Sequence, residues 1–498
     1  MSIAPTATAD LFDFDNTYAS QLDGFFAPKQ PVEVPQPRLV RFNRELAASL
    51  GLNPDALDGE LGASIFAGNT VPDGATPIAQ AYAGHQFGGF NPQLGDGRAV
   101  LLGEIVDPHG DRYDIALKGS GRTPFSRGGD GRAALGPVLR EYLMGEAMHA
   151  LGIPTTRALA AVTTGEQVVR ERALPGAVLT RVAASHLRVG TFQFFAARGD
   201  TKKLRRLVDY ALARHDPGLA DAPNPALALL HAVIERQATL IAAWMNVGFI
   251  HGVMNTDNVA VSGETIDFGP CAFMEGFDQG AVFSSIDEGG RYAYGNQPSI
   301  GKWNMARLAE TLLPLLADDQ ERAVQLATEA LDRFDGLYLD AWLAGARRKL
   351  GLALDHDDDL TLLTDWLDLL AEQRVDYTLA WRRLADAAEG NDATLQALFD
   401  THDTLDAWLT RWNDRLDGDS AEPAARAAAM RMVNPIYIAR NHLVEEALAA
   451  AVDHDDLGPF ERLLDVVTDP YTERLADVRF AHPAPPEFTA GYRTFCGT

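Results

Sequence analysis

The chain has 498 residues, more than one ordinary hydrophobic core accommodates, so two or three domains or lobes are expected. Its composition, with 46% apolar and 22% charged residues, is typical of a globular protein. A net charge of −26 argues against nucleic acid or an anionic membrane as the main partner.

Cysteine content and hydropathy indicate in which cellular compartment the protein is expected. Two cysteines, Cys271 and Cys496, argue against a disulfide-stapled secreted fold and indicate a reducing environment. The first 20 residues contain neither a basic region nor an apolar run, so no targeting peptide is predicted. The longest charge-free stretch, 237–256, is interrupted by glycine and polar residues and predicts a buried helix running into a loop. We therefore expect a cytoplasmic protein without a membrane span.

Residues 1–80 are predicted to be an irregular and partly helical extension. A proline-rich stretch at 27–37 is followed by a helical pattern at 41–52, which ends at a glycine.

Residues 81–200 are predicted to form a strand-rich, nucleotide-binding lobe. The apolar runs 99–106 and 113–119 are joined by the turn signal "DPHGD", and a helical pattern follows at 136–151. Further strands are predicted at 156–164, 167–174 and 176–184. Residues 101–210 carry 16 Lys or Arg against 11 Asp or Glu, a net of +5 in an acidic protein. This excess suits a polyphosphate site, with chance fluctuation along the chain as the alternative.

The second half of the chain is predicted to be helical. A long helix at 226–249 leads into the motif "HGVMNTDN", which places a catalytic lobe at 201–300. Amphipathic helices with acidic connectors then fill a C-terminal region at 301–498. Strands first and helices second indicate an α+β protein with a protein kinase-like, two-lobed fold and a large helical extension.

The first half also contains candidate phosphate-binding residues. Gly95 and Gly97 precede a strand, where glycines let backbone N–H groups approach phosphate oxygens, although a plain turn is the alternative. Lys118 ends the next strand in "DIALKG", which is similar to the lysine-bearing strand of kinases. Glu141 and Glu146 lie on the following helix, and either could hold the lysine; Glu141 is the better candidate.

The loop 251–258 and the later "DFG" form the strongest pair of motifs. Asn258 follows His251 by the same step as in the kinase catalytic loop, but Val253 occupies the position of the catalytic aspartate. Asn258 and Asp267 supply oxygen ligands of the kind that magnesium prefers. Asp257 is the remaining carboxylate, as a proton acceptor, a loop cap or a third metal ligand.

Together these motifs resemble the selenoprotein O (SelO) family of pseudokinases, which are protein adenylyltransferases. The resemblance is carried by "YAGHQFGGFNPQLGDGRA", "LKGSGRTPFSRGGDGRAALG", "GFIHGVMNTDNVAVSGETIDFGP", "GRYAYGNQPSIGKWNMARLAETLLPL" and "MRMVNPIYIARNHLVEEAL". It implies a kinase-like fold that binds ATP flipped relative to kinases and transfers AMP to Ser, Thr or Tyr of protein substrates. A role in redox homeostasis is also implied.

The resemblance assigns roles residue by residue. Asp257 would be the proton acceptor, Asn258 and Asp267 the ligands of Mg²⁺ with Mn²⁺ as the alternative, and Glu141 the support of Lys118. The ATP-binding residues would be Gly95, Gly97, Arg98, Lys118, Asp130, Gly131, Arg181, Arg188 and Asp267.

The same resemblance implies a redox-dependent disulfide between Cys271, just after "DFG", and Cys496, third from the C-terminus. By composition alone, two free thiols are the alternative. For the activity as a whole the alternatives are UMP transfer from UTP with manganese, a conventional phosphotransferase, and a nucleotide-binding scaffold.

Overall fold

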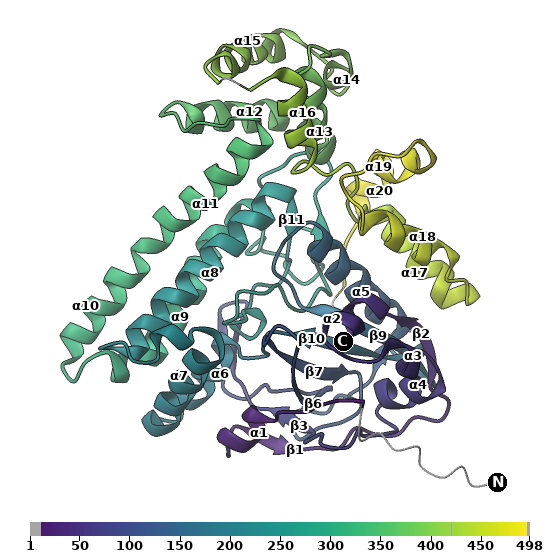
Figure 1. Cartoon of the computed structure of the whole chain (residues 1–498), viewed down its shortest axis with the longest axis vertical. Helices are drawn as coiled ribbons and strands as arrows, with labels where there is room; N and C mark the ends of the chain where they lie inside the picture. Colours follow the sequence, from purple (N-terminus) through teal and green to yellow (C-terminus); the bar gives the residue numbers. More distant parts are fainter. Residues whose placement is uncertain (1–10, 420, 496–498) are drawn as a thin grey trace.

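The computed structural model describes residues 11–419 and 421–495 and has a mixed α/β architecture with an antiparallel main sheet (Figure 1). The strand order is β1-β3-β6-β7-β10-β9-β2, with β8 paired to β10. The strands are β1 (Phe26–Pro28), β2 (Arg38–Phe42), β3 (Ile78–Gln80), β6 (Ala99–Val106), β7 (Arg112–Lys118), β8 (Ala133–Ala134), β9 (Arg157–Val169) and β10 (Ala173–Ala183).

The two faces of this sheet are covered by different helices. On β7, Ile115 and Leu117 pack into one apolar cluster, whereas Ala116 packs into another, as the alternation of side chains along a strand requires. The first cluster also contains residues of α2 and α4, and the second contains residues of α5. These helices are α2 (Arg44–Ser49), α3 (Pro54–Leu57), α4 (Glu60–Ala67) and α5 (Leu135–Ala150).

Three predictions about the elements are wrong. The helix expected from residue 41 begins at Arg44, because Arg41 and Phe42 pair with β9 as the end of β2. The strand expected at 167–174 is the end of β9, the turn 170–172 and the start of β10, since the charged residues 170–172 lie outside both strands. Residues 11–80 contain helices as predicted, but they also supply three strands of the sheet, which the prediction of an irregular and helical extension left out.

The long helix α8 (Pro225–Val247) is a core helix. Asn224 caps its start through the Leu227 N–H, and Gly248, with φ of +70°, ends it. By length and composition alone α8 could cross a membrane, but 56% of its most apolar window is buried inside the protein. It packs against α7, α9, α10 and α11.

Two short strands position the motif-bearing loops. β11 (Phe249–Ile250) follows α8 directly and pairs antiparallel with β12 (Ala272–Phe273). The His251–Asn258 loop leaves β11 and the "DFG" segment enters β12, so this pairing holds both motifs at one end of α8. A separate hairpin, β4 (Gly84–Gln86) and β5 (Gly89–Asn91), lies beside the same loop.

The remaining helices surround this centre (Figure 1). The green helices α10 to α16 extend away from the sheet, and the yellow α17 and α18 return to pack against α5. They are α1 (Thr17–Gln21), α6 (Val189–Ala196), α7 (Thr201–His215), α9 (Gln297–Leu316), α10 (Gln320–Leu331), α11 (Arg333–Lys349), α12 (Asp359–Gln373), α13 (Tyr377–Ala387), α14 (Ala393–Gln396), α15 (Asp403–Asp417), α16 (Pro423–Arg431), α17 (Asn441–His454), α18 (Gly458–Val467), α19 (Val478–Ala481) and α20 (Pro486–Gly491).

Candidate functional site

Sheet register brings Lys118 and Arg181 to one face. Lys118 on β7 pairs with Leu179 on β10, and Ala116 pairs with Arg181. Paired residues point to the same side of a sheet, as do residues two apart on a strand, so Lys118 and Arg181 face the same way. That face is the one covered by α5, the helix that carries Glu141.

Three cationic side chains converge on Asp267. The Lys118 ammonium lies 2.6 Å from Asp267 Oδ1 and 2.5 Å from Glu141 Oε2. Arg181 Nη1 lies 2.8 Å from Asp267 Oδ1 and 3.3 Å from Glu141 Oε1. Arg188 Nη1 donates to Asp267 Oδ2 at 3.0 Å. Two carboxylates therefore face three permanent or near-permanent positive charges, an excess suited to a polyphosphate.

The electrostatics of Asp267 follow from this arrangement. Burial by itself raises the pKa of its carboxyl group, but the charges of Lys118, Arg181 and Arg188 outweigh burial and hold that pKa well below its usual range. Asp267 has φ of +66°, in the left-handed region that Asp tolerates better than most residues.

The structure decides between the two glutamates on α5. Glu141 pairs with Lys118, whereas Glu146 accepts from Arg157 Nε at 2.7 Å and from Asn43 Nδ2 at 2.9 Å. The sequence left both glutamates as candidates for the partner of Lys118. Because they are five residues apart on α5, their side chains point in different directions, and Glu146 faces β9.

Asp257 lies beside the cationic cluster in a drier environment. Arg188 Nη1, which reaches Asp267, also donates to the main-chain carbonyl of Asp257 at 2.6 Å. The Asp257 side chain accepts a 3.2 Å hydrogen bond from Gln86 Nε2, while its Oδ1 is buried without a partner among the described residues. Burial raises the pKa of Asp257 to about 6. A buried carboxylate with one unused oxygen is suited to accept a proton.

The hairpin β4–β5 holds this loop, and sequence reasoning missed its contribution. His85 N donates to Thr256 Oγ1 at 2.7 Å, and Phe87 N donates to Asn255 Oδ1 at 3.0 Å. Gly84 packs directly on Asp257, since a Cβ there would lie 2.4 Å from Asp257 Oδ1. The available signal was the glycine-rich "GHQFGGF", which is typical of a tight hairpin.

The segment Gly95–Arg98 enters the site next to Lys118. Arg98 precedes Ala99, whose register partner is Lys118, and the Arg98 carbonyl accepts from Gly119 N at 2.7 Å. Gly95 has φ of +84°, and a Cβ there would lie 2.5 Å from the Phe125 ring. The Gly97 carbonyl accepts from Ser126 Oγ at 2.5 Å, so the loop 123–126 covers this segment.

Asp130 and Gly131 lie apart from the cluster around Asp267. Asp130 forms a 2.7 Å ion pair with Arg170 in the turn between β9 and β10, whereas the ion pairs of Asp267 are with Lys118, Arg181 and Arg188. Gly131, with φ of +72°, packs on Gly121, three residues beyond Lys118. A nucleotide would have to extend past the end of β7 to contact both the cluster around Asp267 and the Asp130–Gly131 segment.

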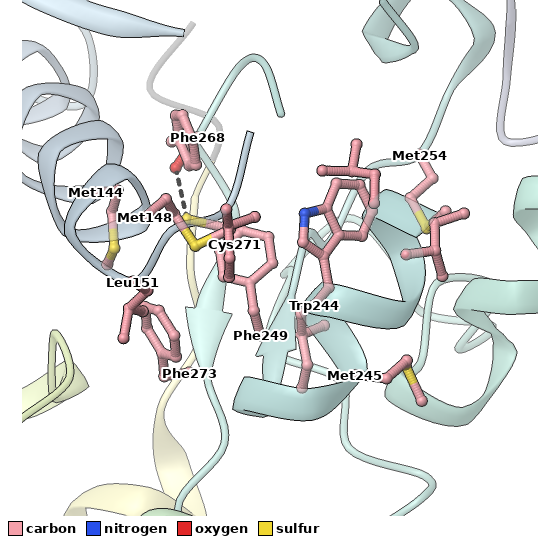
Figure 2. Packing of buried hydrophobic residues seen from close by; sticks show 14 of the residues in the cluster. Met144, Met148, Leu151, Trp244, Met245, Phe249, Met254, Phe268, Cys271 and Phe273 are labelled. Carbon is pink, nitrogen blue, oxygen red and sulfur yellow. Dashed lines mark hydrogen bonds between the residues drawn. The ribbon is translucent and has the colours of Figure 1, made fainter. Parts of the chain in front are cut away.

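Cys271, four residues after Asp267 in the sequence, lies among buried apolar side chains (Figure 2). It carries a free thiol, which donates to the Phe268 carbonyl at 3.1 Å among residues such as Met144 and Met148. Burial raises the pKa of this thiol to about 12, so the thiolate is disfavoured. Cys496, its predicted partner, lies outside the described residues.

The oxygen donors present fit a magnesium ion completed by a nucleotide. In the part of the chain that the structure describes, no cluster of three or more His, Cys, Asp or Glu could bind a metal ion unaided. Asn258 Nδ2 donates to the Val253 carbonyl at 3.0 Å, which leaves the Asn258 amide oxygen available as a metal ligand. One carboxylate and one amide, with phosphate and water completing the shell, is the pattern magnesium favours.

Comparisons with known proteins point in one direction. The family model described as "Protein adenylyltransferase SelO" matches residues 10–468. The chain is 62% identical over 488 residues to a "Protein nucleotidyltransferase YdiU" of Cereibacter sphaeroides, covering 98% of this chain and 100% of that protein. It is 61% identical over 475 residues to the protein of that name from Chromobacterium violaceum, covering 95% and 99%. For the Methylorubrum extorquens protein the identity is 58% over 496 residues, covering 98% and 99%.

Proposed function

The chain belongs to the SelO family and is a protein nucleotidyltransferase, and on that premise we propose that it transfers AMP from ATP to Ser, Thr or Tyr hydroxyls of proteins. The observation that carries this proposal is the convergence of Lys118, Arg181 and Arg188 on Asp267, with Asp257 tied to the same arginine.

In the proposed step the substrate hydroxyl oxygen attacks the α-phosphorus of ATP. A new P–O bond forms to the protein, the bond from the α-phosphorus to the bridging oxygen breaks, and pyrophosphate leaves. The hydroxyl proton passes to Asp257, whose unpartnered Oδ1 supports this role. Lys118, Arg181 and Arg188 neutralise the charge of the phosphates and of the departing pyrophosphate. Glu141 keeps Lys118 in place.

The loss of the kinase base at Val253 is consistent with this chemistry. Val253 is buried and has no group that accepts a proton. ATP bound flipped relative to kinases presents its α-phosphate at the catalytic loop, so that Asp257, four residues further on, meets the attacking hydroxyl.

The proposed architecture is that of a protein kinase with added helices. A nucleotide-binding lobe at 81–200, whose sheet also includes β1, β2 and β3 from before residue 81, and a catalytic lobe at 201–300 enclose the ATP, and 301–498 form the helical extension. The sheet that bears Lys118, the helix that bears Glu141 and the loop that bears Asp257 support this assignment. The nucleotide pocket is completed, near the start of β6 and the end of β7, by Gly95, Gly97, Arg98, Asp130 and Gly131.

Asn258 and Asp267 would hold the metal, Mg²⁺ in the first instance and Mn²⁺ as the alternative. When bound, the ion screens phosphate charge as a Lewis acid. Asp267 would exchange part of its present contacts with cations for the ion.

The site also lies beside a candidate redox device in a cytoplasmic enzyme. Thr494, two residues before Cys496, donates its hydroxyl to the Pro270 carbonyl at 2.6 Å, and Ser285 N donates to the Thr494 carbonyl at 2.9 Å. These contacts support a Cys271–Cys496 disulfide, formed as glutathione disulfide takes two electrons from the two thiols. Peptide mapping after incubation with glutathione disulfide tests it, with Cys271→Ser as control; free thiols throughout would contradict it.

The test of AMP transfer uses reduced protein, magnesium and ATP labelled at either the α- or the γ-phosphate, with a mixed protein extract as substrate. We expect protein-bound label from the α-labelled donor alone, lost in Asp267→Ala. Label from the γ-labelled donor alone would establish a conventional phosphotransferase. Nucleotide binding without either label would indicate a scaffold, and a stronger signal from α-labelled UTP with manganese would indicate UMP transfer.

A further inference from the structure

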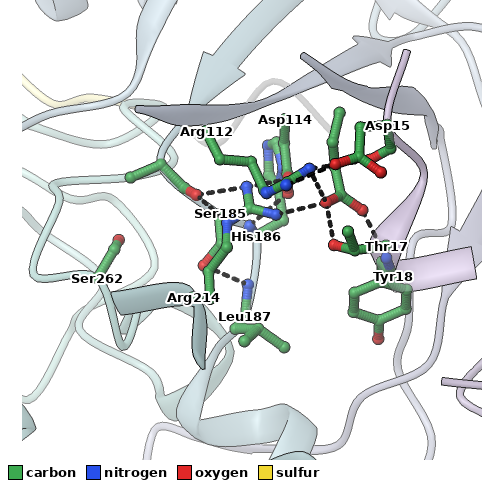
Figure 3. Close-up of polar contacts among 12 residues, drawn as sticks. Asp15, Thr17, Tyr18, Arg112, Asp114, Ser185, His186, Leu187, Arg214 and Ser262 are labelled. Carbon is green, nitrogen blue, oxygen red and sulfur yellow. Dashed lines mark hydrogen bonds and ion pairs between the residues drawn. The ribbon is translucent and has the colours of Figure 1, made fainter. Parts of the chain in front are cut away.

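A buried polar network that includes Asp114, His186 and Arg214 (Figure 3) contacts Arg181 through His186. Asp114 on β7 accepts from Arg214 Nη2 at 2.6 Å, and Arg214 Nη1 also donates to Glu104 at 2.8 Å. His186 follows β10 and lies 2.9 Å from Asp114 through its Nδ1. All four side chains are at most 4% exposed. None of them was among the residues predicted to bind ATP or metal.

His186 connects this network to the site. Its Nε2 accepts a 3.1 Å hydrogen bond from Arg181 Nε, the nitrogen opposite to the Nη1 that contacts Asp267 and Glu141. The main-chain N–H of His186 donates to Asp114 Oδ2 at 2.8 Å, which fixes the position of the imidazole from a second direction.

The partners determine the protonation of the ring. An arginine has donors only, so the Nε2 that faces Arg181 must be unprotonated, and the single ring proton must be on Nδ1, facing Asp114. An imidazolium would set two N–H groups against each other. Burial lowers the pKa of His186, in agreement with a neutral ring.

We propose that His186, oriented by Asp114, is a positioning residue that fixes the plane of the Arg181 guanidinium for the nucleotide phosphates. This inference rests on the proposed function. A guanidinium held at Nε has lost its rotation before the nucleotide arrives, so that less freedom is lost on binding. Arg181 is 3% exposed and spans the space between the network and Asp267, so a displaced guanidinium would face Lys118 and Arg188 in a different geometry.

Two substitutions of similar size separate the two contacts of His186. His186→Gln places a carbonyl oxygen near the position of Nε2, where it can accept from Arg181. His186→Asn keeps a donor near Nδ1 for Asp114 but leaves Arg181 Nε without an acceptor. We expect His186→Asn to weaken binding of a non-hydrolysable ATP analogue, and to raise the KM for ATP, by about tenfold, the size of a lost hydrogen bond to a charged group. In His186→Gln the analogue affinity and the KM for ATP should stay within about threefold of the wild-type values, a smaller change than in His186→Asn.

His215→Asn is the matched control. His215 is another buried histidine of this region, and its Nε2 lies 2.8 Å from Ser185 Oγ rather than near Arg181. A loss of correctly folded protein would lower kcat in proportion and leave the KM and the analogue affinity unchanged. We therefore expect His215→Asn to bind the ATP analogue as tightly as the wild type. His215→Asn and His186→Asn are compared at equal concentrations of folded protein.

A measurement on the wild-type protein covers the case in which His186→Asn does not fold. In protein labelled with ¹⁵N-histidine, the signals missing from His186→Gln identify His186, and its Nδ1 should carry the proton at pH 7.5. A proton on Nε2 would overturn the proposal, as would an unchanged affinity in folded His186→Asn or an equal loss in His186→Gln. Analogue binding needs no transfer, so wild-type protein that binds the analogue but labels nothing contradicts the proposed function alone.

Discussion

Two aspartates in the site lie in opposite electrostatic environments. Asp267 faces three cations, which keep it ionised, while Asp257 has one amide donor and a pKa raised to about 6 by burial. Environments that separate the pKa values of neighbouring carboxylates also separate their chemical roles. Asp267 is suited to bind cations, and Asp257 is suited to exchange a proton.

For Asp257→Asn, we expect AMP transfer to fall by about a hundredfold to ten-thousandfold, the usual contribution of a general base. The affinity for ATP should change little, because the asparagine keeps the shape of the side chain and removes only its proton-accepting carboxylate. Transfer of α-label at saturating ATP measures the first, and analogue binding the second. A transfer rate within about threefold of the wild type would contradict this expectation and would mean that another group accepts the proton.

Glu264 offers a test of stability against pH. Its carboxyl accepts from Ala184 N at 3.1 and 3.0 Å and from Ser262 Oγ at 2.8 Å, but burial raises its pKa to about 7. The folded state therefore binds the proton more tightly than the unfolded state. The contribution of protonated Glu264 to the free energy of unfolding is therefore fully present below pH 4.5 and is lost as the pH rises through 7.

Glu264→Gln should consequently match the wild type near pH 4.5 and be more stable at pH 8, by about 3 kcal/mol. Thermal unfolding of both proteins across this pH range measures the difference. Glu422→Gln, at an exposed position, is the control and should show no trend. A melting-temperature difference that does not grow with pH would contradict the assignment.

At the scale of elements, the hairpin β4–β5 holds the His251–Asn258 loop through hydrogen bonds. Its main chain donates to Asn255 and Thr256, and Gln86 donates to Asp257. Close approach of the two segments requires glycine at position 84, because the space for a Cβ is occupied by Asp257 and by Leu94, 2.8 Å away.

We expect Gly84→Ala to lower AMP transfer by about tenfold or more, since displacement of a proton acceptor by even 1 Å is costly. Gly89→Ala is the matched control in the same hairpin, because a Cβ there meets only the Gln86 carbonyl at an ordinary 3.5 Å. The rate of α-label transfer is measured for both variants. Equal activity in the two would show that the hairpin yields without moving Asp257.

At the scale of the whole molecule, a buried ionic cluster connects the start of α17 to the segment after β12 and to the start of α13. Arg440, fully buried before α17, lies 2.5 Å from Glu275 after β12 and 2.6 Å from Asp376 at the start of α13. It joins segments that are far apart in the sequence, and α17 in turn packs against α5, which bears Glu141.

Arg440→Met should lower the free energy of unfolding by about 3 to 5 kcal/mol, because it leaves two buried carboxylates without their counter-charge. Arg38→Met removes an ion pair with Asp455 in which both side chains are more than half exposed, and should lower the free energy of unfolding far less than Arg440→Met. Thermal and urea unfolding compare the two variants. Similar losses would mean that the buried cluster contributes no more than the surface pair.

Chemical identity and local pattern made much of the site predictable. Lys118 ends an apolar, strand-like run and Asp267 lies in "DFG", so both could be found from neighbours in the chain. The strand expected at 99–106 was confirmed, and that expected at 113–119 differs from β7 by one residue at each end. The strands β9 and β10 were divided wrongly, because a charged tripeptide inside an apolar run does not reveal which residues pair across the turn.

The sequence by itself determined the family, the order of the motifs and the chemistry of each candidate side chain, because these depend on residue type and spacing along one segment. Only the tertiary structure chose Glu141 over Glu146, placed Gly84 on Asp257 and brought His186 into contact with Arg181. Each of these contacts joins residues whose distance depends on the register of a sheet or the packing of a helix. Such distances follow from the burial of the whole core, and no local pattern encodes them.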